Sequence, residues 1–398
     1  MRLLSYSVLL FFMFPWVSFG ILRLDTQPWF IIAGFCYFLL NLNRKAEAFV
    51  YLPFFLFFCS LVVALSYGLF DMLTARAVMG YLAFSVVIYS FYFIKRDYAS
   101  IVPKVIIASN IVWLVVGVGQ ILFGENVFSY IVHVRTTTGR GVTGLAPEPT
   151  FYGIFLFYLS WLLILEGEAI NNNLKKSLIF INLLFVFFVA KSSMVILFIA
   201  LAFSIYMIFT FGSIKRLLTV ILVGCVGLIL LSSFWWVLEG TRVAKLFELF
   251  MLGPKYIIYQ DASVNERVAH IYLSISSSIN NFLVPQGYHG FKSVVDHAFT
   301  ETNGFFWWFG EDDKVMSGVG AIVFELGWFS VAFFLTCILG IFKKHNAKMS
   351  FCALTVFVMV FFSAITISFP LVGMTLVSLH FYFKRKDNED YISYREYR

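Results

Sequence analysis

The chain has 398 residues, of which 61% are hydrophobic and only 13% are charged. Soluble domains carry about 25% charged and about 45–50% apolar residues, so this composition excludes a soluble globular domain and predicts an integral membrane protein. The formal net charge of +7 does not indicate a nucleic-acid-binding protein, because Lys and Arg in membrane proteins mark the cytoplasmic loops.

Apolar stretches follow one another along most of the chain. A helix needs about 20 apolar residues to cross the hydrocarbon core of a bilayer, so the sequence predicts an all-α polytopic membrane protein with about twelve transmembrane helices. The first stretch lacks a clear signal-peptidase cleavage site, and we interpret it as a retained helix. The helices are expected at residues 3–20, 29–42, 49–68, 77–94, 104–123, 149–166, 177–190, 194–211, 217–237, 317–342, 351–368 and 370–383.

Basic residues predict the orientation of these helices. The pairs Arg44-Lys45, Lys95-Arg96 and Lys384-Arg385 fall on alternate connections. If those connections face the cytoplasm, both termini do as well, which agrees with an even number of spans. The chain then divides into transmembrane helices one to five at 1–123, a first large external loop at 124–148, helices six to nine at 149–237, a long external loop at 238–316, helices ten to twelve at 317–383 and a cytoplasmic tail at 384–398.

The first external loop leads into the polar stretch RTTTGRGVTGLAPEPTFYG. Arg135 and Arg140 can each grip phosphate oxygens with two parallel hydrogen bonds, and glycines such as Gly144 are expected to leave backbone amides accessible. Glu148 precedes Pro149, which suits the first turn of a helix. There the helix dipole keeps a carboxylate ionised, as a base or an acceptor requires, although a plain helix cap would look the same. Lipid headgroups or ion pairs are the alternative for the arginines.

The second external loop contains SVNERVAHIYLSISSSINNF, in which apolar residues recur at the spacing of a helix. Ser263 and Glu266 fit a capping box at the start of this helix. The helix carries Arg267, another candidate for binding phosphate, and His270, which we expect on its surface.

Histidines and carboxylates follow in VPQGYHGFKSVVDHAFTETNG, which holds His289 and His297. A histidine beside carboxylates suits a general base or, when protonated, a phosphate contact. Because no short pair of metal ligands such as HxxxH or CxxC is present, we expect neither a metal nor a cofactor. Glu325 lies inside the next apolar stretch, where an acid is functional by default unless it pairs near the interface.

These segments together resemble the bacterial O-antigen and exopolysaccharide polymerases of the Wzy type. RTTTGRGVTGLAPEPTFYG resembles their Arg…Gly…Glu-Pro-Ser stretch, and AKSSM, Arg267, VPQGYHG with His297, and SGVGAIVFELGWFSVAFF follow in the same order. The resemblance covers residues 135–340 and extends to the related O-antigen ligases. The usual His-Asn or His-Ser pair of the ligases is His297-Ala298 here, a departure that favours a polymerase.

The resemblance implies a glycosyltransferase with a fold like that of the membrane-embedded GT-C enzymes. It would lie in the bacterial inner membrane, with both termini in the cytoplasm and the two large loops in the periplasm. Its partners would be undecaprenyl-diphosphate-linked oligosaccharides as donor and acceptor, membrane lipids and a regulator of polysaccharide chain length.

The resemblance also implies roles for the residues singled out above. External arginines would stabilise the pyrophosphate as it departs, and a carboxylate or histidine would take the proton of the attacking hydroxyl. Catalytic roles are expected for Arg140, Glu148, Arg267 and His297, and substrate contacts for Arg135, Arg140, Gly144, Arg267 and His289.

Three other classes of protein remain open at this point. A flippase for the same lipid-linked sugar also suits twelve spans, but its polar residues are expected near the midplane and not in external loops. A ligase would transfer finished polymer to the lipid A core. A binding or sensing protein without catalysis has no distinguishing feature in the sequence.

Overall fold

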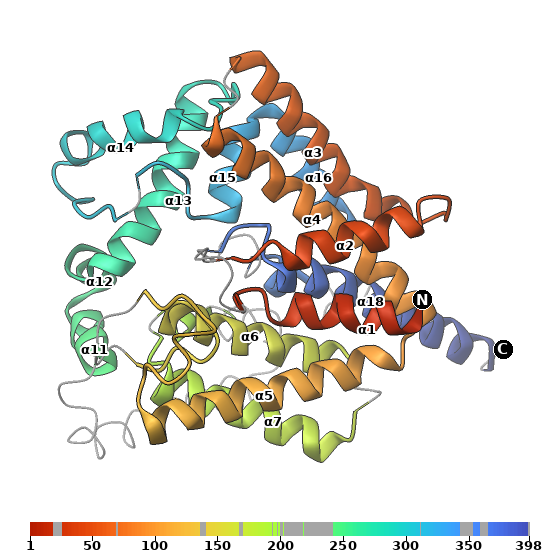
Figure 1. Cartoon of the computed structure of the whole chain (residues 1–398). Coiled ribbons are helices and arrows are strands. Elements are labelled where there is room, and N and C mark those ends of the chain that lie inside the picture. Colours follow the sequence, from red (N-terminus) through yellow and green to blue (C-terminus); the bar gives the residue numbers. More distant parts are fainter. Residues whose placement is uncertain are drawn as a thin grey trace. The chain divides into compact units, whose positions relative to one another are not determined.

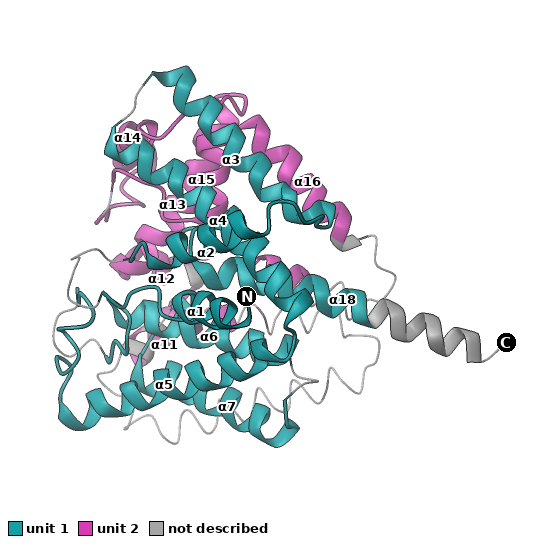
Figure 2. Ribbon diagram, turned by 45° about the vertical axis from the view of Figure 1, so that its right-hand side comes forward, with its two compact units in different colours: residues 1–195, 365–398 teal, residues 196–364 magenta. Residues whose placement is uncertain are grey.

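The computed structural model of the chain is built from helices, turns and loops, and the part of the chain that it describes contains no strand (Figure 1). It describes residues 1–18, 26–68, 71–135, 141–166, 170–192, 242–310, 312–342, 353–358 and 365–396, with isolated residues between 194 and 218. The predicted helices at 194–211, 217–237 and 351–368 fall largely outside these ranges. The chain forms two compact units, Met1–Val195 with Ile365–Arg398 (unit 1) and Ile196–Ala364 (unit 2) (Figure 2).

Unit 1 contains the first seven predicted helices and the last. Four of its helical segments are long and apolar enough, by length and composition, to cross a membrane: Ala48–Tyr67, Met72–Asp97, Ile101–Phe123 and Asn172–Val189. This supports membrane association, while the count of twelve spans stays a prediction. The elements are α1 (Arg2–Met13), α2 (Trp29–Leu40), α3 (Ala48–Tyr67), α4 (Met72–Asp97), α5 (Ile101–Phe123), α6 (Pro149–Leu165), α7 (Asn172–Leu184) with the π-helical turn η2 (Phe185–Val189), and α18 (Pro370–Glu396).

Helix α4 forms the centre of unit 1. It contacts α1, α2, α3, α5 and α18, and every residue from Ala83 to Lys95 is buried. A helix that is apolar all round is the kind that packs inside a protein or a membrane. The rings of Trp16, Trp113, Phe155 and Phe369 pack together beside it, with centroids 4.0–6.1 Å apart, and hold α5, α6 and α18 to the N-terminal segment.

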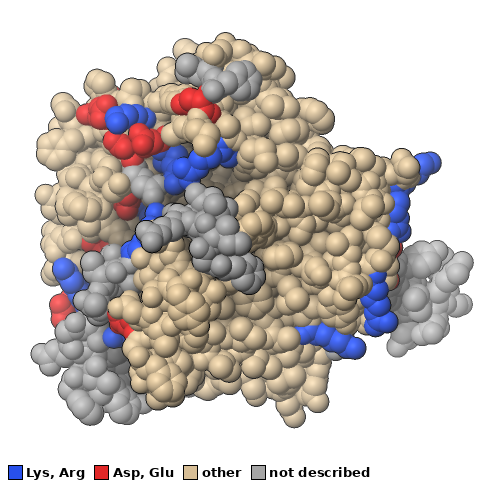
Figure 3. Space-filling model, in the orientation of Figure 1, with Lys and Arg blue, Asp and Glu red and all other residues tan. Residues whose placement is uncertain are grey.

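Charged side chains from three predicted cytoplasmic connections meet at one end of unit 1. Arg44, between α2 and α3, forms a salt bridge with Asp97 at the end of α4. Glu47 accepts a hydrogen bond from Lys384 of α18 at 2.7 Å. Figure 3 shows Lys and Arg along the right-hand edge of the face it presents, and a second group of Lys and Arg beside Asp and Glu toward the upper left. The packing of unit 1 is therefore compatible with the prediction that these connections lie on one side of the membrane. That this side is the cytoplasmic one stays a prediction.

The same end of unit 1 holds a buried ion pair. The side chains of Lys95 and Glu166 are each only 6% exposed and form a salt bridge. Ser378 of α18 donates a hydrogen bond to the same Glu166 oxygen at 2.7 Å. Lys95 was expected in a cytoplasmic connection and is buried instead. The sequence did not reveal this burial, because the partners at the end of α6 and on α18 lie far away along the chain.

Unit 2 is built around a core between α13, α14 and α15. Its elements are α11 (Arg242–Leu252), α12 (Pro254–Gln260), α13 (Ala262–Asn280), α14 (Gly290–Glu301), α15 (Gly318–Leu326) and α16 (Trp328–Phe342). The predicted helix in the second external loop is thus confirmed as α13. The buried members of the core are Ala269, Leu273, Phe291, Val295, Ala298, Phe306, Val315 and Phe324.

Helix α13 differs from the sequence-based expectation at its start and at His270. Asp261, and not Ser263, caps the helix by accepting the N–H of Val264 at 3.0 Å. Glu266 instead accepts the N–H of Gly310 at 2.7 Å. His270 is fully buried, not on the surface, and its Nδ1 accepts the N–H of Met316 at 3.2 Å. The contacts of Glu266 and His270 have one cause, since the segment after α14 runs along α13 and its backbone donors find acceptors there.

The predicted span at 317–342 is two helices. Gly327 has φ 51° and ψ −122° and separates α15 from α16. A Cβ atom at this position would lie 2.1 Å from the carbonyl oxygen of Leu283, and the N–H of Trp328 donates to that oxygen at 2.9 Å. The break therefore comes from a tertiary contact that only glycine permits.

Two predicted boundaries at the ends of the chain are also wrong. Helix α1 ends at Met13 and does not reach residue 20, because Pro15 lacks a backbone N–H and disfavours helical backbone before it. Helix α18 does not end at 383 but continues to Glu396, so the expected cytoplasmic tail is partly helical.

Candidate functional site

The first group of predicted site residues lies at the N-terminus of α6. A guanidinium nitrogen of Arg135 is 3.5 Å from a carboxylate oxygen of Glu148, and the two side chains are 34% and 29% exposed. The backbone N–H of Arg135 donates to the carbonyl of Pro147 at 2.8 Å. The structure thus brings Arg135 and Glu148 together at a partly exposed position, in an ion pair of the kind that was the alternative for the arginines. Arg140 lies outside the described residues.

The segment that leads into α6 is buried, although the sequence suggested an exposed loop. Residues 141–147 are all buried. The N–H of Val142 donates to the carbonyl of Val189 in η2 at 3.1 Å. Gly141 has φ 123°, and a Cβ atom there would lie 2.8 Å from the carbonyl oxygen of Ala190. Lys191, which follows η2, has a left-handed backbone with φ 49°.

Gln120 of α5 holds this buried segment in place. Its Oε1 accepts the N–H of Gly144 at 2.7 Å, and its Nε2 donates to Thr143 Oγ1 at 3.1 Å and to the carbonyl of Gly144 at 3.2 Å. The amide of Gly144 is therefore engaged within the chain, contrary to the expected accessibility. A substrate contact of Gly144 stays a prediction. Sequence reasoning missed Gln120 because it is a single amide inside an apolar stretch.

Glu148 occupies the N-cap position of α6, but its side chain makes no capping hydrogen bond. The plain helix-cap interpretation therefore loses its main support. Pro149 begins α6 as predicted. The Glu148 carboxylate therefore lies beside the Arg135 guanidinium and at the start of α6, with no capping hydrogen bond from its side chain. The geometry is that of an acceptor next to a cation that can also contact a phosphate.

Replacement of Glu148 by Gln tests this acceptor. The amide keeps the size of the side chain but cannot take a proton. If the chain is a polysaccharide polymerase, as the resemblance implies, the yield of long polymer should fall by about 100-fold or more, the range of a lost general base. The measurement is a gel of surface polysaccharide from a strain expressing the variant at wild-type level. Glu125→Gln, in the same predicted loop, is the matched control and should leave the polymer unchanged. Unchanged polymer in both variants would exclude Glu148 as the base.

The second group of predicted site residues lies in unit 2. Arg267 is on α13 and donates a hydrogen bond to Ser263 Oγ. His289 directly precedes α14. His297 is exposed on α14, and its Nδ1–H donates to the carbonyl of Ser293 at 2.7 Å, which leaves Nε2 as the nitrogen that can take a proton. Because Arg135 and Glu148 belong to unit 1, a joint site that combines both groups stays a prediction.

Two further ionisable residues are Lys292 on α14 and Glu325 on α15, of which Glu325 was a candidate in the sequence. The Nζ of Lys292 lies 3.6 Å from Asp312 and 3.7 Å from Asp313, and the charges of these two aspartates raise the pKa of the lysine. This lysine is therefore engaged in ion pairs. Glu325 is half-buried near the end of α15, two residues before Gly327, and its function stays a prediction.

Among the residues that the structure describes, no three His, Cys, Asp or Glu side chains gather closely enough to hold a metal ion. The expectation of a metal-free reaction is not tested by this finding and stays a prediction.

Comparisons with known proteins give no assignment. No model of a known protein family matches the sequence, and no curated protein is significantly similar to it. The assignment of a function therefore depends on the residues themselves and on the resemblance stated for residues 135–340.

Proposed function

We propose that this protein is a surface-polysaccharide polymerase, a glycosyltransferase that joins undecaprenyl-diphosphate-linked oligosaccharide units at the periplasmic face of the bacterial inner membrane. The observation that carries the proposal is the arrangement at the start of α6. A partly exposed Arg135–Glu148 pair, 3.5 Å apart, lies at a helix N-terminus, directly after a buried segment fixed by Gln120. A cation, a proton acceptor and the positive end of a helix dipole suit a reaction that expels pyrophosphate.

The proposed reaction is a single displacement at the anomeric carbon of the donor sugar. A hydroxyl oxygen of the acceptor unit forms the new glycosidic bond as the bond between the anomeric carbon and the pyrophosphate oxygen breaks. Glu148 or His297 takes the hydroxyl proton, and undecaprenyl diphosphate leaves with the electron pair. Arg140 and Arg267, with Arg135, stabilise the charge that develops on the pyrophosphate.

A flippase is the main alternative, and the interior of unit 1 argues against it. The mid-helix polar cluster that the described part of unit 1 contains is neutral: Asn110 Nδ2 donates to Asn182 Oδ1 at 3.1 Å, and Asn182 Nδ2 donates to Ser160 Oγ at 3.1 Å. A carrier of a pyrophosphate-linked sugar is expected to hold anionic groups near the midplane with helix N-termini or cations. The candidate arginine and carboxylate lie instead in the predicted external loop, where it joins α6.

The decisive experiment is a gel of surface polysaccharide from a deletion strain. A polymerase predicts a core that carries a single repeat unit and no ladder, restored by the wild-type gene. Absence of attached polymer with accumulation of lipid-linked polymer would indicate a ligase. Accumulation of lipid-linked single units in the cytoplasm would indicate a flippase, and a normal ladder would contradict the whole proposal.

A further inference from the structure

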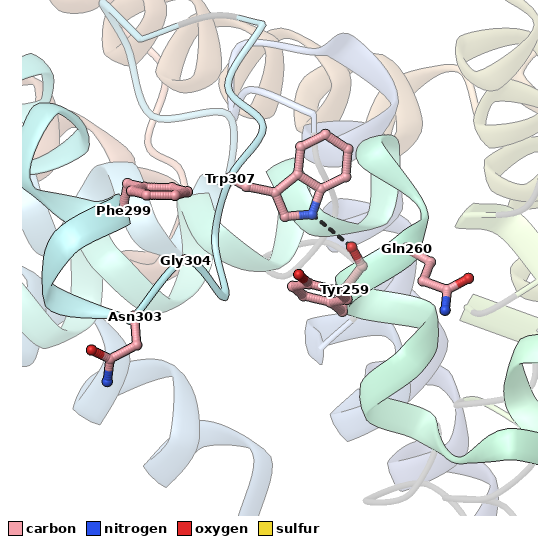
Figure 4. Close-up of a pocket in the computed structure, with 6 residues that line it drawn as sticks. All are labelled: Tyr259, Gln260, Phe299, Asn303, Gly304 and Trp307. Atoms are coloured by element: carbon pink, nitrogen blue, oxygen red, sulfur yellow. Dashed lines mark hydrogen bonds between the residues drawn. The ribbon is translucent and has the colours of Figure 1, made fainter.

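An open pocket of about 580 Å³ lies in unit 2, between the end of α12 and the segment after α14. Figure 4 shows the indole of Trp307 next to Tyr259, and Phe299 at the end of α14 and Asn303 just after it on the other side of the pocket. None of these positions was a candidate in the sequence. The pocket is lined by Tyr259, Gln260, Phe299, Asn303, Gly304 and Trp307.

The lining combines aromatic faces with amides and contains no charged side chain. Trp307, Tyr259 and Phe299 keep 39%, 50% and 60% of their surface exposed. The flat face of an aromatic ring carries partial negative charge, which suits the polarised C–H groups on one face of a sugar ring. The side-chain amides of Gln260 and Asn303 both donate and accept hydrogen bonds, as the hydroxyl groups at the rim of a sugar require.

The exposed tryptophan is held rigidly, which is unusual for a ring at the surface. Its backbone N–H donates to Asn265 Oδ1 at 3.1 Å, and its indole Nε1–H donates to the carbonyl of Tyr259 at 2.6 Å (Figure 4). Asn265 is itself fully buried, and its Nδ2 donates to the carbonyls of Ile258 and Phe305. A preformed position of this kind lowers the entropy lost on binding.

The turn opposite Trp307 is fixed as well. Asn303 and Gly304 have φ of 51° and 74°, and the N–H of Gly304 donates to the carbonyl of Phe299 at 2.7 Å. Two successive left-handed residues make a sharp turn that an unstructured loop would not hold. Both walls of the pocket are therefore set before a ligand arrives.

Anchoring at the membrane interface is the other use of exposed aromatic residues. Interfacial Trp and Tyr sit with an apolar ring toward lipid and a polar end toward the headgroups. Here the indole N–H of Trp307 is already engaged by the carbonyl of Tyr259, and the ring lines an open pocket with two amides. These features favour a sugar over a lipid surface.

We infer that this pocket binds a neutral sugar ring of the glycan that the protein elongates. The inference rests on the proposed function, because that function supplies an oligosaccharide as substrate. It adds a subsite that recognises sugar, separate from the residues expected to act on pyrophosphate.

The test is oligosaccharide binding to the purified full-length protein in detergent micelles. The probe is the repeat-unit oligosaccharide released from the cell's own surface polysaccharide, and the readout is titration calorimetry. Trp307→Ala should raise the dissociation constant at least tenfold, and Gln260→Ala should raise it several-fold. Trp307→Phe keeps a ring and should lie between wild type and Trp307→Ala, which guards against a variant that simply unfolds.

Trp308→Ala is the matched control. Trp308 is the neighbouring residue, is 46% exposed and also donates its backbone N–H to Asn265 Oδ1, but it does not line the pocket. Its removal should leave the dissociation constant unchanged. Wild-type affinity in Trp307→Ala would overturn the inference. Equal losses of affinity in the two tryptophan variants would overturn it as well, and would indicate a general aromatic surface such as a membrane contact.

Failure of the pocket and failure of the proposed function give different results. If the deletion strain lacks the ladder but the wild-type protein does not bind the oligosaccharide, the pocket inference fails and the polymerase proposal stands. If the deletion strain makes a normal ladder, the polymerase proposal fails, and with it the reason for expecting this glycan in the pocket.

Discussion

Replacing Lys95 by Met is expected to destabilise the protein by about 3–5 kcal/mol, because the change leaves Glu166 as a buried charge without its cation. Both side chains are only 6% exposed, and the remaining hydrogen bond from Ser378 does not neutralise the carboxylate. Glu166→Gln should have a comparable effect, since it leaves the lysine buried and unpaired. The measurement is unfolding of the purified protein in detergent, followed by tryptophan fluorescence.

The double variant Lys95→Met with Glu166→Leu sharpens this test. Because it removes both charges, it should recover much of the stability lost in either single variant. Lys104→Met is the control, since Lys104 is exposed at the start of α5 and should change stability by no more than about 0.5 kcal/mol. Single variants as stable as this control, or a double variant as unstable as the sum of the singles, would show that the pair is not coupled.

Replacing Arg140 or Arg267 by Ala is expected to lower the yield of long polymer by about 100-fold or more, the range for removing one group that stabilises charge in the transition state. The corresponding Lys variants should recover only part of the activity, because an ammonium group cannot make the paired hydrogen bonds of a guanidinium. The measurement is the polysaccharide ladder, with an immunoblot to show that each variant reaches the membrane.

Two controls separate this charge effect from folding. Lys255→Ala removes an exposed cation from the same predicted loop as Arg267 and should leave the ladder intact. Ser263→Ala removes the hydroxyl that accepts from Arg267 but keeps the guanidinium, so it should retain most of the polymer. Full-length ladders in both arginine variants would contradict a pyrophosphate clamp.

Hydropathy was sufficient to place the long helices. The predicted spans at 49–68, 104–123 and 149–166 agree closely with α3, α5 and α6, because a run of about 20 apolar residues has few alternatives to a membrane-spanning or buried helix. Local pattern was not sufficient where a distant segment decides the structure. The break at Gly327 requires the carbonyl of Leu283, and the burial of Lys95 requires Glu166.

The candidate site could be predicted in part for the same reason. Arg135 and Glu148 lie in the same short polar stretch, and Pro149 marks where α6 begins. The local pattern therefore placed both residues near the start of this helix. The buried position of Gly144 depends on Gln120, which lies 24 residues earlier in the sequence, on α5. The pocket beside Trp307 depends on Asn265, which is 42 residues away. Contacts over such distances leave no periodicity in the sequence.

The hydrogen bonds of Gln120 also affect the entropy cost of binding a ligand near Arg135. The segment is closed at one end by the hydrogen bond from Arg135 to Pro147, and Gln120 fastens the residues just before Pro147 to α5. The conformational entropy lost in bringing Arg135, Gly144 and Pro147 into these positions is therefore lost during folding and not when substrate binds. If Arg135 contacts the pyrophosphate as proposed, a Gln120→Ala protein should bind pyrophosphate more weakly although it keeps every group proposed to touch it.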